Sequence, residues 1–214
     1  MRIDPAGWPF IFGSALIGLV PAVLLGWGWG IPGWLLAVVC LFFFRDPERQ
    51  ISALDNQVLS PADGRVMVAG PPTGTSVPAG TWLQISIFLS PMDVHVNRIP
   101  LSGRVTHVEH HPGSFLPAYR REAGDLNEYT EIWIEHGSTR LVVRQIVGLL
   151  ARRIVCRTTV GATVATGERY GVMKFGSRMD LFLPVDAVLQ VSPGDRVRAG
   201  ITVLATLQTR GTGA

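Results

Sequence analysis

The sequence is poor in charge, in lysine and in cysteine. Only 16% of its 214 residues are charged while 47% are hydrophobic, which indicates one ordinary domain with part of the chain in lipid. The two cysteines, Cys40 and Cys156, have no CxxC or Cys/His spacing, so we interpret both as reduced residues of a protein that faces the cytosol. The sequence also has no basic run, zinc spacing or recognition-helix pattern, so we expect no nucleic-acid partner. A GxSxG elbow is missing as well, which disfavours a serine hydrolase.

Lys174 is the only lysine, so arginine supplies every other fixed positive charge on a side chain. Arginine suits bidentate contacts with phosphate and carboxylate groups better than lysine does. With a formal net charge of +3, a basic surface beside a membrane would favour anionic lipids.

The longest uncharged stretch runs from Pro5 to Phe44, and the turn-forming segment GWGWGIPG at 26–33 interrupts it. This pattern predicts a hydrophobic helical hairpin that dips into the membrane, or in its extreme form two short spans. A cleaved signal peptide is disfavoured, because LFFFRDPER runs directly from apolar residues into charge. We therefore divide the chain into a membrane-anchoring segment, 1–45, and one further domain, 46–214.

After Arg45 the sequence changes to short runs rich in β-branched residues, separated by Gly, Pro, Asn and Asp. Examples are TWLQISIFLS at 81–90 and EIWIEHGSTRLVVRQIVG at 131–148. The pattern predicts a mainly β domain with a sandwich or barrel-like architecture.

The most informative segment is GERYGVMKFGSRMDLFLP at 167–184, which contains the pair Gly176-Ser177. A Gly-Ser pair is most often a turn. It also permits self-cleavage, because a serine hydroxyl can attack the preceding carbonyl and glycine lets the backbone bend into the geometry required. Elimination from the resulting ester, followed by hydrolysis, would leave a pyruvoyl group on the new C-terminal chain.

The chain resembles the short bacterial type of phosphatidylserine decarboxylase. The resemblance runs from about Leu54 to Leu204 and is specific because its motifs occur together and in order. They are SPADGRV at 60, FLSPMDVHVNRIP at 88, HHPGSF at 110, LNEYTEIWIE at 126, GLLARRIVC at 148 and the segment at 167–184. The resemblance implies a domain shaped like a lipoyl or biotinyl hammerhead, a cut between Gly176 and Ser177, and conversion of phosphatidylserine to phosphatidylethanolamine.

The chemistry agrees with this implication, because loss of a carboxylate requires an electron sink conjugated to the amine. Pyridoxal phosphate would need Lys174, whereas a pyruvoyl group made from Ser177 forms the Schiff base with the substrate amine directly. The expected cofactor is therefore the covalent pyruvoyl group. The expected assembly is a heterodimer of the two cleavage products on the cytoplasmic side of an anionic cell membrane.

Self-cleavage needs a base for the Ser177 hydroxyl, and the candidates are Asp63 in SPADG and His95 in PMDVH. Longer relatives carry their self-cleavage histidine three residues after the equivalent of His95, where this chain has Arg98. An arginine stays protonated and cannot act as the base. We therefore assign the base to His95, on an extended strand beside Asp93, and expect Asp63 to orient it.

The remaining site predictions concern the lipid head group. We expect its phosphate and carboxylate to contact Arg98, His110, Arg152 and Arg153, with Arg120 and Arg121 as further candidates. The spacing of His107, His110 and His111 lacks the glutamate and the distant third ligand of a zinc motif, so we expect no metal.

Two alternatives remain open. VMKF at 172 resembles the lysine hairpin of biotinyl and lipoyl carriers, so the protein would then be a carrier modified on Lys174. A decarboxylase of an archaeal-type serine lipid would share every motif listed above.

Overall fold

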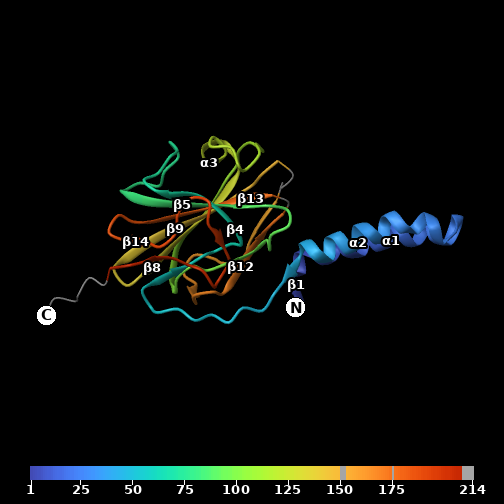
Figure 1. Ribbon diagram of the computed structural model, residues 1–214, viewed down its shortest axis with the longest axis horizontal. Coiled ribbons are helices and arrows are strands. Elements are labelled where there is room, and N and C mark those ends of the chain that lie inside the picture. The colour runs from blue at the N-terminus through green and yellow to red at the C-terminus, as the bar shows by residue number, and fades with distance from the viewer. Residues whose placement is uncertain (150–152, 175, 209–214) are drawn as a thin grey trace.

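The hydrophobic segment forms a closed helical hairpin. The computed structural model describes residues 1–149, 153–174 and 176–208. After β1 (Arg2–Ile3) and a 3-10 turn η1 (Pro5–Gly7) come helix α1 (Trp8–Leu25), a second 3-10 turn η2 (Trp27–Gly30) and helix α2 (Ile31–Phe43). β2 (Arg45–Asp46) then pairs antiparallel with β1, which closes the base of the hairpin. Figure 1 shows both helices lying side by side and projecting away from the β domain, with the N-terminus at their base.

Glycines allow the two helices to approach closely. A Cβ on Gly33 would lie 2.2 Å from the Gly18 nitrogen, so no larger residue fits there without moving a helix. Most of the hairpin's large apolar side chains are exposed, including Phe12 at 66% and Val23 at 74%. Water does not favour such a continuous apolar surface. The stretch Pro5–Leu25, with mean hydropathy 2.0, is long and apolar enough to cross a membrane and could anchor the protein there.

The β domain is built on one large antiparallel sheet, and its strand order is β11-β7-β8-β9-β13-β5-β4-β15. In chain order, its strands are β4 (Gly64–Gly70), β5 (Trp82–Leu89), β7 (Gly103–His111), β8 (Tyr129–His136), β9 (Thr139–Ile146), β11 (Thr163–Val164), β13 (Ser177–Pro184) and β15 (Arg196–Val197). β13 lies in the middle of this sheet, paired with β5 on one side and β9 on the other.

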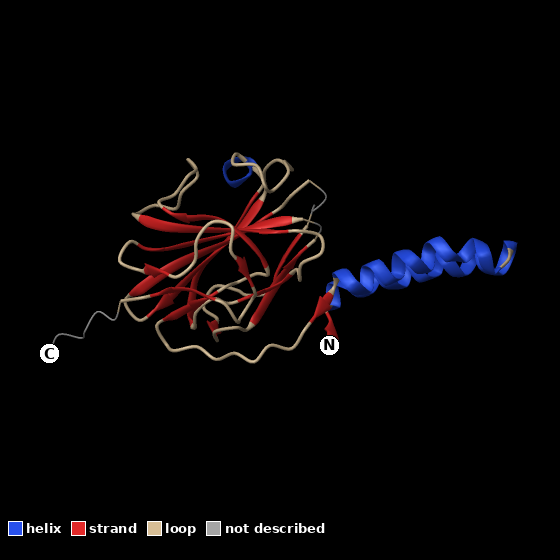
Figure 2. Cartoon of the chain, in the orientation of Figure 1, coloured by secondary structure: helices blue, strands red, loops and turns tan. Residues whose placement is uncertain are grey.

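Two three-stranded sheets pack on the large sheet. Figure 2 shows that the domain beside the helical pair consists mostly of strands and loops. One has the order β14-β16-β3 and consists of β3 (Gln57–Leu59), β14 (Val188–Leu189) and β16 (Val203–Thr206). The other has the order β10-β12-β6 and consists of β6 (Val96–Arg98), β10 (Ile154–Cys156) and β12 (Arg169–Met173). The short helix α3 (Ala123–Leu126) lies in the connection between β7 and β8.

The main core lies between the large sheet and the two small ones. Met179, Leu181 and Leu183 of β13 point into it and pack in one cluster with Tyr170 and Met173 of β12. This alternation is that of a strand with one face on the core. The arrangement confirms a mainly β, sandwich-like domain with an N-terminal helical pair, and the sheets formed by the described residues do not close into a barrel.

Candidate active site

The Gly176-Ser177 peptide lies where the chain enters β13. Gly176 has φ +71°, a backbone conformation that residues other than glycine rarely adopt. Ser177 is the first residue of β13, opposite Leu89 of β5, and is fully buried. Its hydroxyl oxygen has no hydrogen-bond partner in the described part of the chain. A buried hydroxyl without a partner is costly, so its presence beside a left-handed glycine points to a chemical task.

His95 lies against this peptide. It is fully buried just before β6, with Nδ1 2.9 Å from the Asp93 carbonyl oxygen and Nε2 3.4 Å from the Gly176 nitrogen. The Gly176 N–H donates to Nε2, so Nδ1 carries the proton and donates to Asp93. Burial, the largest cause, lowers the pKa of His95 to about 4. The imidazole is therefore neutral near pH 7, and its Nε2 lies beside the backbone nitrogen of Gly176, the residue before Ser177.

The prediction that Asp93 and His95 lie on one extended strand is wrong. Residues 90–93 form a turn, in which the Ser90 N–H donates to the Asp93 carboxylate at 2.8 Å, and β6 begins only at Val96. The backbone carbonyl of Asp93, rather than its carboxylate, thus orients the imidazole.

Asp63 lies in a different contact network. One of its carboxylate oxygens accepts from Arg49 at 2.8 Å and the other accepts from the Ala199 N–H at 2.7 Å. The expected role of Asp63 in orienting His95 has no support in these contacts, since the imidazole nitrogens are occupied by Asp93 and Gly176.

The contacts of Arg98 also lie away from the Gly176-Ser177 peptide. Its guanidinium is buried, pairs with Asp46 at 3.2 Å and donates to the carbonyl oxygens of Pro47 and Gly167. Burial lowers its pKa, with Arg169 as a second cause. These contacts join the segment after the hairpin to the strand that leads to the cleavage site, so Arg98 has a structural task.

The other predicted contacts to the head group are scattered. Arg152 lies outside the described residues, while Arg120, Arg121 and Arg153 are exposed. His110 is on β7, three strands from β13, and contacts Thr130 at 3.1 Å. Its neighbours His107 and His111 both pair with Glu109. Within the described ranges, no group of three or more His, Cys, Asp or Glu could hold a metal ion.

Sequence reasoning missed two features, the first of them at the scissile peptide. A Cβ on Gly148 would lie 2.0 Å from the Gly176 carbonyl oxygen, so Gly148 leaves room for the carbonyl that the serine would attack. Gln145 donates to Asn97 at 2.8 Å in a buried amide pair, and the other polar atom of each amide lacks a partner in the described structure. The motifs GLLARRIVC and HVNR contain or adjoin these residues, but a motif does not tell which of its members approach each other.

Lys174 is buried, unlike the lysine of a carrier domain. Its side chain is only 9% exposed, and its amine lies over the Phe10 ring at 4.6 Å from the ring centre. Burial, followed by the nearby Arg153, lowers its pKa. A carrier lysine must reach a partner enzyme from an exposed turn, so this environment disfavours that alternative.

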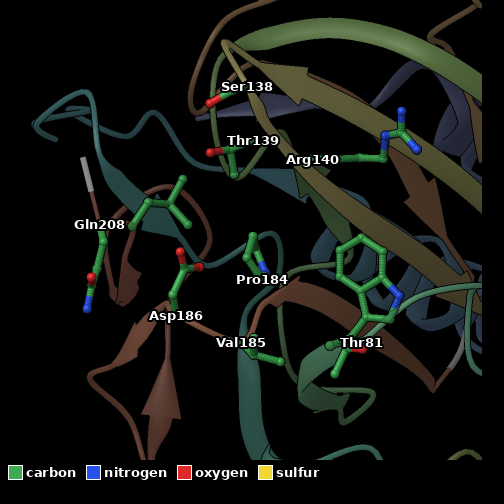
Figure 3. A pocket seen from close by; sticks show the side chains of 10 residues that line it. Thr81, Ser138, Thr139, Arg140, Pro184, Val185, Asp186 and Gln208 are labelled. Atoms are coloured by element: carbon green, nitrogen blue, oxygen red, sulfur yellow. The ribbon is translucent and has the colours of Figure 1, made fainter. Parts of the chain in front are cut away.

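The pocket in Figure 3 lies far from this chemistry. Thr81, Ser138 and Pro184 border it. Pro184 and Ser177 are the two ends of the eight-residue strand β13, roughly 23 Å apart at about 3.3 Å per residue. The candidate active site is therefore the buried peptide beside His95 and not this surface hollow.

Comparison with known proteins agrees with this geometry. Residues 36–205 match the family model described as phosphatidylserine decarboxylase. The chain belongs to this family. It is 44% identical over 203 residues to the phosphatidylserine decarboxylase proenzyme of Symbiobacterium thermophilum, covering 94% of each chain. It is 40% identical over 200 residues to the proenzyme of Nitrosomonas europaea, covering 93% of this chain and 92% of the relative.

The family assignment confirms the resemblance found in the sequence and makes the protein a decarboxylase, a lyase of phospholipid biosynthesis. Its relatives are named proenzymes, which implies a processing step.

Proposed function

We propose that the protein cuts itself between Gly176 and Ser177 and then decarboxylates phosphatidylserine to phosphatidylethanolamine. The observation that carries this proposal is the buried Ser177 hydroxyl without a described partner, next to a left-handed Gly176 whose N–H contacts the neutral His95 imidazole. A neutral imidazole can accept a proton near pH 7.

The cleavage proceeds in steps that conserve atoms. Nε2 of His95 first exchanges its contact with the Gly176 N–H for the Ser177 hydroxyl and takes the hydroxyl proton, so that the serine oxygen attacks the Gly176 carbonyl carbon. The C–N bond between Gly176 and Ser177 then breaks, the Ser177 nitrogen takes up that proton, and an ester replaces the peptide bond. Loss of the serine α-proton then breaks the ester, leaving a Gly176 carboxylate and a dehydroalanine at position 177. Water hydrolyses the dehydroalanine to a pyruvoyl group and releases ammonia.

The pyruvoyl group supplies the electron sink that decarboxylation requires. The surroundings of position 177 suit a pyruvoyl group, because this group is as small as the buried serine that it replaces. The neutral His95 lies nearby and can carry a proton. His95 would hold the proton that replaces the lost carboxylate. Arg153, near enough to Lys174 to affect its pKa, is our candidate for a head-group contact, together with Arg152. Asp63 takes no proton in these steps; its carboxylate holds the SPADG turn against Ala199 and Arg49.

The two products would remain together as a heterodimer. β13 belongs to the new C-terminal chain, yet it pairs with β5 and β9 of the other chain along most of its length. β16 likewise pairs with β3. Separating these strands would expose the main core to water.

The hairpin would place this assembly at the cell membrane. Arg2, Arg45 and Arg49 flank the hairpin's base, and arginine next to an apolar span is retained on the cytoplasmic side. The catalytic domain would then face the cytoplasm and receive phosphatidylserine from the adjoining leaflet.

The test combines processing with turnover. Purified full-length protein should appear as two chains and convert phosphatidylserine in mixed vesicles to phosphatidylethanolamine, whereas Ser177→Ala should give one uncut, inactive chain. A cut, active Ser177→Ala variant would contradict the proposal. An archaeal-type serine lipid offered in the same vesicles decides between the two substrate classes. A mass increase on Lys174 in an uncut chain would favour a carrier.

A further inference from the structure

The end of the hairpin packs against the candidate catalytic histidine. Phe43, the last residue of α2, is only 3% exposed, and its ring centre lies 4.1 Å from that of the His95 imidazole. The next residue, Phe44, is fully buried and stacks on Phe10 of α1 with ring centres 5.5 Å apart. Phe43 and Phe44 differ from most large apolar side chains of the hairpin, which are exposed.

Polar contacts fix this end of the hairpin on the β domain. The Asp4 carboxylate accepts two hydrogen bonds from Arg157, at 2.6 and 2.9 Å, and the Asp4 N–H donates to the Phe44 carbonyl oxygen at 2.9 Å. Asp46, in β2, pairs with both Arg98 and Arg169. The position of the Phe43 ring is thus set from both sides by the β domain.

We propose that Phe43 is a positioning residue for His95: its ring covers one face of the imidazole, excludes water, and holds Nε2 toward Gly176. The hairpin would then be a wall of the active site as well as an anchor. This inference rests on the proposed role of His95, but the contact itself can be tested without catalysis.

The physical basis is the environment of the imidazole. The groups that face or influence it are the Gly176 N–H, the Asp93 carbonyl and carboxylate, and the Arg45 guanidinium. Asp93 raises the pKa of His95 and Arg45 lowers it, yet burial is the largest cause of the value of about 4. Removing the Phe43 ring would admit water to one face of the imidazole. The pKa should then move back toward 6.5, and the ring should turn more freely about its χ2 bond.

The experiment follows the His95 ring by NMR as the pH is changed. Full-length Ser177→Ala protein in lipid nanodiscs serves as the parent, because it should remain uncut, and a His95→Gln variant assigns the signal. Phe43→Ala is compared with Phe43→Val and with Phe12→Ala. The last is a matched control, since Phe12 lies in the same hairpin and is 66% exposed.

We expect His95 to titrate near pH 4 in the parent and in Phe12→Ala, and at a clearly higher pH, closer to 6.5, in Phe43→Ala, with Phe43→Val between them. With Ser177 restored, Phe43→Ala should cut itself about tenfold more slowly near pH 7 than Phe12→Ala does. An unchanged His95 titration in folded Phe43→Ala would overturn the proposal. If that variant does not fold, an unchanged titration in Phe43→Val overturns it instead. Cleavage of the Ser177→Ala parent would contradict the proposed function alone, because the titration would still report on the Phe43 contact.

Discussion

Replacing Gly148 with alanine should slow self-cleavage strongly, because the new methyl group collides with the carbonyl that the serine attacks. The added Cβ would lie 2.0 Å from the Gly176 carbonyl oxygen, whereas an ordinary contact begins at 3.4 Å. The carbonyl or Gly148 must therefore give way by about 1.4 Å, and a misplacement of about 1 Å at a reacting group can cost roughly 100-fold in rate. We predict a cleavage rate constant about 100-fold lower than that of the wild type.

The assay follows cleavage after cell-free synthesis in the presence of nanodiscs, by the appearance of the small chain on a denaturing gel. Gly103→Ala is the matched control, because its Cβ would lie 2.3 Å from the Glu135 carbonyl oxygen. That collision is on β7, which β8 and β9 separate from β13. If Gly148→Ala is cut at the wild-type rate, or both variants are slowed equally, then Gly148 does not act by leaving room for the Gly176 carbonyl.

Three further predictions concern the hairpin and the buried charges. Deleting residues 1–44 should release the β domain from membranes at high salt and, because it uncovers His95, should also stop cleavage; a vesicle sedimentation assay and a gel measure the two effects. Between pH 6.5 and about 4 His95 is protonated only in the unfolded state, so the free energy of unfolding of the Ser177→Ala protein should fall by up to roughly 3 kcal/mol as the pH falls. Urea unfolding measures this loss, which should be absent in Ser177→Ala/His95→Gln. Arg98→Met should cost about 3 kcal/mol in the same unfolding assay, because a buried partner of Asp46 is removed, while Arg153→Met should cost little; equal losses would contradict the structural task of Arg98.

The sequence predicts the architecture and the reacting pair well. The uncharged stretch from Pro5 to Phe44 forms the hairpin, and the short β-branched runs form the strands, because both depend on local patterns of apolar residues. Gly176 and His95 come together in space, as the assignment of the base to His95 requires.

What the sequence could not give depends on contacts between distant segments. Asp63 lies in a family motif, but its partners Arg49 and Ala199 are set by the tertiary fold. Phe43 looks like any lipid-facing residue of an apolar helix, and only the docked hairpin reveals it beside His95. Arg98 resembles a surface arginine until its ion pair with Asp46 is seen.

Ser177 should become the blocked end of a second chain, and the intact masses of the denatured, purified protein show whether it does. We expect two species, residues 1–176 and residues 177–214, the second lighter than the unmodified peptide by one ammonia molecule and gaining mass with hydroxylamine. A single species with the full mass of all 214 residues, in a preparation that decarboxylates phosphatidylserine, would contradict it.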